Sequence, residues 1–103
     1  MRYVFHPEAA AELNSAIDYY EEISPGLGYD FALEVYSTIE KILCFPKAWV
    51  ELEDGIRRCQ TQRFPYGILY SSEENTIFIL AVMHLQRDPD YWKGRKDQDK
   101  DYP

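Results

Sequence analysis

The sequence predicts a small α+β domain in which an antiparallel helix pair packs on a small, mainly antiparallel sheet, in the chain order βααβββ. Three observations lead to this fold class. The 103 residues allow one domain, and 46% hydrophobic residues, with 16% aromatic ones, supply one core. Apolar residues recur at spacings of three and four over residues 8–44, which is the helical period. Residues 56–84 hold β-prone runs separated by turn residues.

The first strand leads directly into the first helix. Residues 2–5 form a short β-prone run, and Pro7 suits the first helical position because that position needs no backbone N–H donor. The helix is predicted to extend over residues 8–23 and to end at Ser24-Pro25-Gly26. Its apolar stripe consists of Ala9, Leu13, Ala16, Ile17 and Tyr20.

A second helix is predicted from about residues 27–29 to Cys44, with Pro46 just past its end. Because the loop between the two helices is short, they are expected to pack antiparallel. Residues 49–55, which are acidic, are predicted to form a connecting loop. The buried stripe of the second helix consists of Phe31, Val35, Ile39, Ile42 and Leu43.

Three strands follow the helices. Residues 56–62 alternate between two faces as a strand does, and residues 66–70 form a second run after Pro65. A polar turn at residues 71–75 leads into a third, largely apolar strand over residues 76–84. The short connections predict an antiparallel meander.

The single domain is assigned to residues 1–95. From Lys93 onward charges alternate without an apolar residue up to position 101, so the chain is expected to end in a charged, frayed tail, assigned to residues 96–103. Cys44 and Cys59 are expected to be buried, reduced thiols because two cysteines cannot form a dense disulfide framework. The expected shared core consists of Leu13, Ile17, Phe31, Val35, Ile39, Ile68, Ile77, Ile79 and Val82.

The net charge of −7 is unevenly distributed. Residues 1–55 hold 3 basic and 11 acidic side chains, whereas residues 56–70 hold three arginines and no acid. Such a chain repels polyanions overall, which disfavours nucleic-acid binding without excluding it at the arginines. The longest uncharged run, residues 75–86, is too short for a membrane helix, so a soluble, cytoplasmic protein without membrane contact is expected.

Common cofactor and metal motifs are absent from the sequence. The two histidines, His6 and His84, are 78 positions apart, and the cysteines have no paired spacing, so no metal site is expected. Gly26 and Gly28 lie between two helices and lack a third glycine, which is the wrong context for a dinucleotide-binding loop. No cofactor is therefore predicted.

Residues 84–92, directly after the most apolar strand, hold the most unusual combination of side chains. Loops after strands often carry sites, and arginines here could hold phosphates while an imidazole or a phenol moves protons. The candidate catalytic residues, for a nuclease only, are His84, Arg87 and Tyr91. The candidate target- or phosphate-binding residues are Arg57, Arg58, Arg63, Arg87, Tyr91 and Trp92.

A purely structural role is the alternative for the same residues. In that case Arg87 pairs with Asp88 or Asp90, and Tyr91 and Trp92 pack under the sheet. Residue types alone favour this alternative. The functional hypothesis expects five side chains to converge where the strands of the meander meet the C-terminal loop: Arg58, Arg63, His84, Arg87 and Tyr91.

The sequence resembles the RelE/ParE family of bacterial toxins, and its ParE-like, plasmid-stabilisation branch in particular. The similarity covers about residues 3–95 and includes the order βααβββ. It rests on the segments Phe5-x-Pro7-x-Ala9 with Leu13, Tyr19-Tyr20, Gly26-Leu27-Gly28 with Phe31, Pro46, Ile56-Arg57-Arg58, Arg63-Phe64-Pro65-Tyr66-x-Ile68-x-Tyr70 and Ala81-Val82-x-His84-x-x-Arg87-x-Pro89-x-Tyr91-Trp92.

The resemblance implies the toxin of a type II toxin–antitoxin module, which arrests growth and is neutralised by a cognate antitoxin protein. Two mechanisms occur in such toxins: inhibition of DNA gyrase by a protein contact, and ribosome-dependent cleavage of mRNA. The ribonucleases usually carry an arginine after the tyrosine that is Tyr66 here, and this chain has Gly67 there. Gly67 and the acidity favour gyrase inhibition, with no enzyme activity and no sequence-specific DNA binding alone. A ribosome-dependent nuclease and a non-toxic binding relic remain the alternatives.

Overall fold

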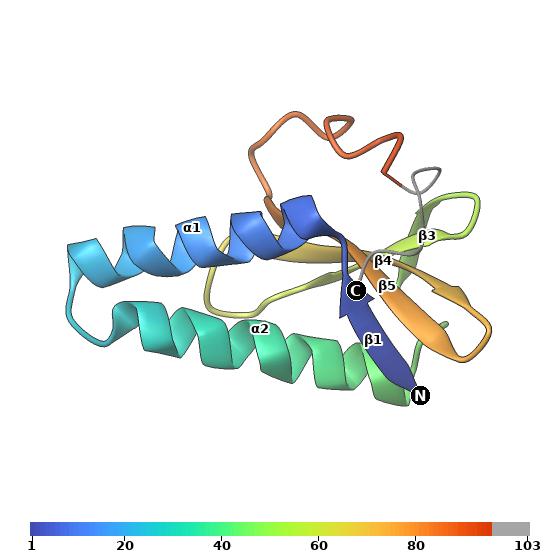
Figure 1. The fold of residues 1–103 in the computed structure, drawn as a ribbon, viewed down its shortest axis with the longest axis horizontal. Helices are drawn as coiled ribbons and strands as arrows, with labels where there is room; N and C mark the ends of the chain where they lie inside the picture. Colours follow the sequence, from blue (N-terminus) through green and yellow to red (C-terminus); the bar gives the residue numbers. More distant parts are fainter. Residues whose placement is uncertain (96–103) are drawn as a thin grey trace.

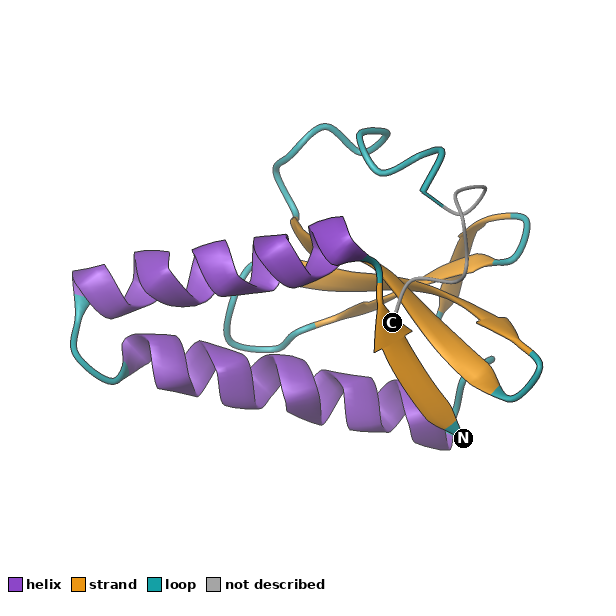
Figure 2. Cartoon of the chain, in the orientation of Figure 1, coloured by secondary structure: helices purple, strands orange, loops and turns teal. Residues whose placement is uncertain are grey.

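The computed structural model describes residues 1–95 and confirms the predicted fold class. Two helices lie side by side and antiparallel along one face of a five-stranded sheet (Figure 1). Figure 2 shows how the helices keep to that side, while the chain after the last strand is a loop. The elements are β1 (Arg2–Phe5), α1 (Pro7–Ile23), α2 (Leu27–Cys44), β2 (Val50–Glu53), β3 (Ile56–Gln60), β4 (Tyr66–Glu73) and β5 (Thr76–His84).

The sheet is mixed, with the strand order β1-β5-β4-β3-β2. The four strands β2 to β5 form the expected antiparallel meander, whereas β1 lies parallel to β5, with Arg2 opposite Thr76 and Phe5 opposite Ile79. The pairing of β4 with β5 shifts register between Leu69 and Tyr70. Because β1 ends at Phe5, the last part of β5 has no neighbouring strand on that side.

Side chains cap both helices of the hairpin. The Nδ1 atom of His6 accepts a hydrogen bond of 3.1 Å from the backbone N–H of Glu8, and Pro7 occupies the first turn of α1 as predicted. The carboxylate of Glu21 accepts hydrogen bonds from the backbone N–H groups of Gly26 and Gly28 at the start of α2. A Cβ at Gly28 would lie 2.5 Å from the carbonyl oxygen of Ile17, so only glycine allows the helices to approach this closely.

The first core lies between the helices and the sheet. It contains the expected residues except Ile17, which is partly buried and packs against the others. Tyr70, which is 1% exposed, adds a phenol whose hydroxyl donates a 2.6 Å hydrogen bond to the carbonyl oxygen of Pro46. The buried members are Ala9, Leu13, Ala16, Phe31, Val35, Ile39, Ile42, Cys59, Phe64, Ile68, Tyr70, Ile77, Ile79 and Val82.

A second core lies on the opposite face of the sheet, and the irregular segment of residues 85–95 covers it. We call this segment the strap; Figure 1 shows it in orange and red, beyond α1 on the side away from α2. Trp92 is the strap residue in this core and is 2% exposed. The buried members of the second core are Ile56, Leu69, Leu80, Ala81, Met83 and Trp92.

The structure corrects several boundaries. Residues 49–55 are not simply a loop, because Val50–Glu53 form the edge strand β2, and β3 ends at Gln60 rather than at residue 62. Strand β4 extends to Glu73, so the turn before β5 is shorter than predicted. The expectation of two buried thiols is wrong for Cys44, which is exposed, and holds for Cys59.

The charged end of the chain begins later than its composition suggests. Lys93 bridges Glu53 and Asp90 at 3.3 Å and 3.2 Å, and Arg95 is buried. The tail predicted over residues 96–103 lies outside the described residues. Within residues 1–95, no helix combines the length and the apolar character that a membrane crossing needs.

Candidate functional site

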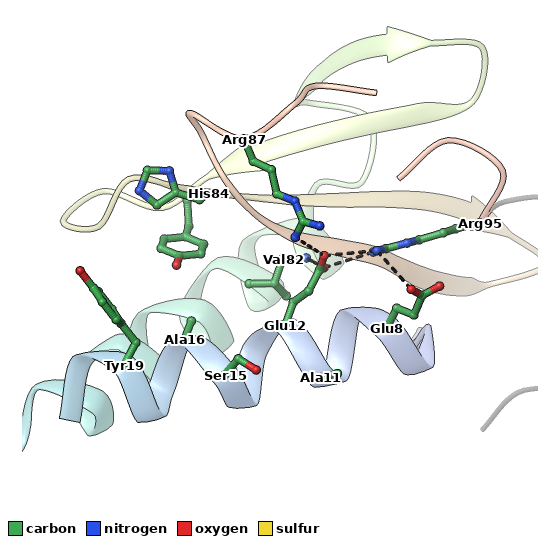
Figure 3. A pocket seen from close by; sticks show the side chains of 11 residues that line it. Glu8, Ala11, Glu12, Ser15, Ala16, Tyr19, Val82, His84, Arg87 and Arg95 are labelled. Carbon is green, nitrogen blue, oxygen red and sulfur yellow. Dashed lines mark hydrogen bonds and ion pairs between the residues drawn. The ribbon is translucent and has the colours of Figure 1, made fainter. Parts of the chain in front are cut away.

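A groove with a volume of about 420 Å³ lies between α1, the end of β5 and the strap (Figure 3). Helix α1 contributes Glu12 and Tyr19, strand β5 contributes His84, and the strap contributes Arg87 and Arg95. In Figure 3 the carboxylates and arginines gather at one end of the groove, whereas His84 and Tyr19 lie at the other.

Glu12 is the centre of the charged end. Its Oε1 accepts hydrogen bonds of 3.0 Å from the backbone N–H of Val82 and 3.1 Å from Nη1 of Arg95. Its Oε2 accepts longer ones, of 3.2 Å from Nη2 of Arg95 and 3.4 Å from Nη1 of Arg87. Glu12 thus accepts the hydrogen bond of the Val82 N–H in the part of β5 that has no pairing with β1. Without this acceptor the donor would be buried and unpaired, which costs free energy.

Arg95 fastens the strap to the sheet and to α1. Its side chain is 8% exposed, and its Nη1 also donates a hydrogen bond of 2.9 Å to the carbonyl oxygen of Leu80. Glu8 lies 3.8 Å from its Nη2. A buried guanidinium needs a charged partner and filled hydrogen bonds, and Glu12 with Leu80 supplies them.

Tyr91 lies beneath the two arginines of the groove. The guanidinium carbon of Arg87 is 3.7 Å from the centre of the Tyr91 ring, and that of Arg95 is 4.9 Å away, which are cation–π distances. Burial and the neighbouring Glu12 carboxylate raise the pKa of Tyr91 far above its ordinary value. A phenol in this position stays protonated and is a poor proton acceptor at neutral pH.

His84 occupies the aromatic end of the groove. Its Nδ1 accepts a 3.1 Å hydrogen bond from the backbone N–H of Gln86, and its ring lies edge-on to Tyr66 with centroids 5.2 Å apart. Burial and the neighbouring Tyr20 and Tyr19 hydroxyls raise the pKa of Tyr66. The imidazole therefore forms part of an aromatic wall, and its Nδ1 already accepts a hydrogen bond within the loop.

The predicted site residues do not all meet. His84, Arg87 and Tyr91 lie at or under the groove, but Arg63 forms an exposed pair of 3.2 Å with Asp30 of α2. Arg57 donates to the carbonyl oxygen of Trp49 at 2.7 Å and lies 3.6 Å from Glu51. Arg58 and Trp92 line another hollow, beyond the strap. The expected convergence is therefore wrong for Arg63, which lies at α2, and for Arg58, which lines a different hollow from His84 and Arg87.

The expected structural alternative was right in one part. Trp92 is buried in the second core and Tyr91 packs against it, as that alternative predicted. Arg87, however, pairs with Glu12 rather than with Asp88 or Asp90. No sequence pattern signals this pair, because the partners are 75 positions apart.

Glu12 and Arg95 are the site residues that sequence reasoning missed. Glu12 has the polar character of the exposed helix face, yet its side chain is only 13% exposed. Arg95 lies among tail-like charges, yet it is buried, with its guanidinium bonded to Glu12 and Leu80. Across residues 1–95, His, Cys, Asp and Glu side chains form no cluster of three or more suited to a metal ion.

Comparisons with known proteins agree with this architecture. A family model described as the ParE toxin of the type II toxin–antitoxin system parDE matches residues 3–89. A solved structure of the chromosomal ParDE toxin–antitoxin system from P. aeruginosa has a similar fold, with a TM-score of 0.69. It shares 18% sequence identity, over 82% of this chain and 94% of that chain. A search of curated proteins gives no match.

Proposed function

The chain belongs to the ParE toxin family of type II toxin–antitoxin systems, and we propose that it arrests bacterial growth by binding DNA gyrase until a cognate antitoxin neutralises it. Binding to a protein target needs a shaped surface and no reacting groups. The groove and the strap supply such a surface, with aromatic and arginine side chains of the kind that dominate protein interfaces.

The observation that carries this proposal is that the arginines that would hold phosphate lie away from the groove or are already paired within it. A nuclease needs phosphate-binding arginines and a proton-transferring group that act together. Here Arg63 is paired with α2, Arg87 is paired with Glu12, and Tyr91 holds its proton tightly. This arrangement favours a binding protein over a ribosome-dependent nuclease.

Expression in a bacterial host separates the three hypotheses. Gyrase inhibition should give growth arrest with DNA damage, a ribonuclease should give arrest with codon-positioned mRNA cuts, and a relic should give no effect. The purified chain is expected to cleave no RNA, with or without ribosomes. Direct binding to purified gyrase, measured by co-sedimentation, is the positive test.

A pair of variants sharpens that test. Growth arrest is expected to survive His84→Ala better than Trp92→Ala, because Trp92 anchors the strap whereas His84 contributes a side wall of the groove. Thermal unfolding of both variants distinguishes a lost contact from a lost fold. Ribosome-dependent mRNA cuts that disappear with His84→Ala would overturn the proposal and move the chain to the enzymes.

The antitoxin is expected to lay an extended or helical segment with apolar anchors over the helix pair and the sheet edge. The helices expose large apolar side chains, among them Tyr29 and Leu33, which are 67% and 52% exposed. The acidic N-terminal half favours lysine or arginine beside those anchors. Tyr29→Ser combined with Leu33→Ser should weaken co-purification of the neighbouring gene product, and unchanged co-purification would contradict this mode of binding.

A further inference from the structure

The strap borders a second hollow on the side away from the groove. This hollow has a volume of about 210 Å³. Arg58 of β3 lies in its wall, together with the apolar side chains of Leu52, Met83, Pro89 and Trp92. Lys93, Glu53 and Asp90 line it too, but Lys93 already pairs with both acids, so Arg58 is the cation of this wall that has no carboxylate partner among residues 1–95.

Arg58, like Arg2 in β1, lacks the carboxylate partner that the four other arginines of the described chain have. Arg57, Arg63, Arg87 and Arg95 each have a carboxylate within 4.0 Å, whereas no ion pair or hydrogen bond of the Arg58 side chain occurs within residues 1–95. Its Nε is buried and has no acceptor. Such a cation in so acidic a chain is available for an acceptor from outside the described residues.

The sequence makes room for this arginine at Gly67. A Cβ at that position would lie 2.9 Å from Cδ and 3.0 Å from Cγ of Arg58, so the arginine stem lies directly over the glycine. Gly67, whose presence disfavours a nuclease, thus also leaves the space that the Arg58 side chain occupies on the sheet. Any side chain at position 67 would displace the Arg58 stem.

Trp92 supplies the second, independent observation. The residue is 2% exposed, it lines the same hollow, and its indole Nε1–H has no acceptor within the described chain. Buried donors in native proteins nearly always find acceptors. Two residues that each carry a buried donor without an acceptor, one of them cationic, therefore line one small hollow.

We propose that this hollow binds a single carboxylate of a protein partner, an assignment that rests on the proposed function of a protein-binding toxin. A guanidinium binds a carboxylate through charge-assisted hydrogen bonds, and the apolar wall suits the aliphatic stem of a glutamate. Glu53 and Asp90 also line the hollow, each paired with Lys93, so its four charged side chains together carry no net charge. A nucleic-acid backbone would bring repeated charges against those acids, which disfavours it as the ligand.

The test is an NMR titration with a probe that carries one carboxylate, N-acetyl-glutamate α-methylamide. The isosteric N-acetyl-glutamine α-methylamide is the control. The readouts are the indole Nε1–H signal of Trp92 and the Nε–H signal of Arg58. Trp49 is an internal control, because its indole N–H is also buried without an acceptor but the residue packs against the first core.

The glutamate probe should shift the Trp92 and Arg58 signals saturably and leave Trp49 unchanged. The glutamine probe should need an at least about tenfold higher concentration, because it lacks the charge. Arg58→Gln should abolish the shift of Trp92, whereas Arg2→Gln, at the opposite edge of the sheet, should retain it. Gly67→Ala keeps the charge but displaces the Arg58 stem, so it should also weaken binding even if Arg58→Gln fails to fold.

Three results would overturn the proposal: equal binding of both probes, binding that survives Arg58→Gln and Gly67→Ala, or tighter binding of inorganic phosphate or a short RNA than of glutamate. The failure of the proposed function looks different. Glutamate binding in a chain that arrests no growth and binds no gyrase would leave the carboxylate site standing and remove the toxin mechanism. Growth arrest through gyrase without glutamate binding would support the toxin mechanism and remove the carboxylate site.

Discussion

The two faces of the sheet are covered in different ways. The helices α1 and α2 cover one face with 17 and 18 residues whose backbone hydrogen bonds are internal. The strap covers the other face, and most of its backbone bonds are local turns, such as those from Tyr91 N–H to Asp88 and from Arg95 N–H to Trp92, with one longer-range bond from Leu85 N–H to Pro65. The helix face is therefore held by regular backbone hydrogen bonds, whereas the strap is held mainly by side chains, above all those of Trp92 and Arg95.

This difference also separates the roles of the faces. Segments with few internal bonds and few anchors open at lower free energy than a packed core does. The strap borders both the groove and the Arg58 hollow, so the least self-sufficient part of the chain shapes both candidate binding surfaces. Variants in the two regions should therefore differ in kind as well as in size.

The largest effect is expected on the helix face, from Ile39→Ala. Ile39 is 1% exposed in the first core, and its truncation should lower the free energy of unfolding by about 2–5 kcal/mol. Chemical denaturation measures this loss, and hydrogen exchange should speed up throughout the chain. A loss as small as that of a surface substitution would contradict the core placement.

An alkaline titration compares one tyrosine from each face, the buried Tyr70 and the partly buried Tyr91. Burial raises the pKa of Tyr70 to about 12 from the ordinary 10.0. The unfolded chain therefore loses this proton first, so stability is full below pH 10 and falls by about 2–3 kcal/mol as the pH rises to 12. Denaturation of Tyr70→Phe, which lacks the titrating group, should show a correspondingly smaller loss over that range.

Tyr91 sharpens the same experiment because its pKa is also raised by burial and by Glu12. Arg95→Met removes the hydrogen bonds that hold the strap to Glu12 and Leu80. If the strap opens independently, Tyr91 in this variant should titrate near its ordinary pKa while Tyr70 stays protonated. NMR of the two rings gives the measurement. Parallel titration of both rings in that variant would mean that the two faces open together.

The smallest effects distinguish two ion pairs. Arg95→Met removes a buried partner of Glu12 and Leu80 and should lower stability by about 1–3 kcal/mol, with faster hydrogen exchange confined to the strap. Arg63→Ala removes a pair with Asp30 whose side chains are 58% and 44% exposed, and should cost less than about 1 kcal/mol. Equal losses of stability in the two variants would mean that the buried Arg95 pair contributes no more than the exposed Arg63 pair.

Much of the fold could be predicted from the sequence because its main signals are local. The helical stripes gave both helices, and the bounds of β5 agree with the predicted run 76–84. Strand β2 was missed because Val50–Glu53 is short, acidic and exposed along its length, although the alternation of Val50 and Leu52 with glutamates has the period of a strand. Its strand conformation is completed by pairing with β3.

The site was less predictable, because its contacts join distant parts of the chain. His84, Arg87 and Tyr91 stood out through their residue types, but the partner that organises them, Glu12, lies on the first helix. Arg95 bonds to Glu12 across 83 positions, and a tail-like composition gives no sign of its burial. The sequence therefore indicated which residue types of this region could carry a site, but not which distant residues they contact.

The parallel pairing of β1 with β5 imposes an order on the assembly of the chain as it is synthesised. Arg2 pairs with Thr76, so the first strand has no neighbour in the sheet until the fifth strand has emerged and the intervening loop has closed. The helix hairpin needs only neighbouring segments and can form first. The groove requires α1, β5 and the strap together, so it is complete only at the last stage of folding.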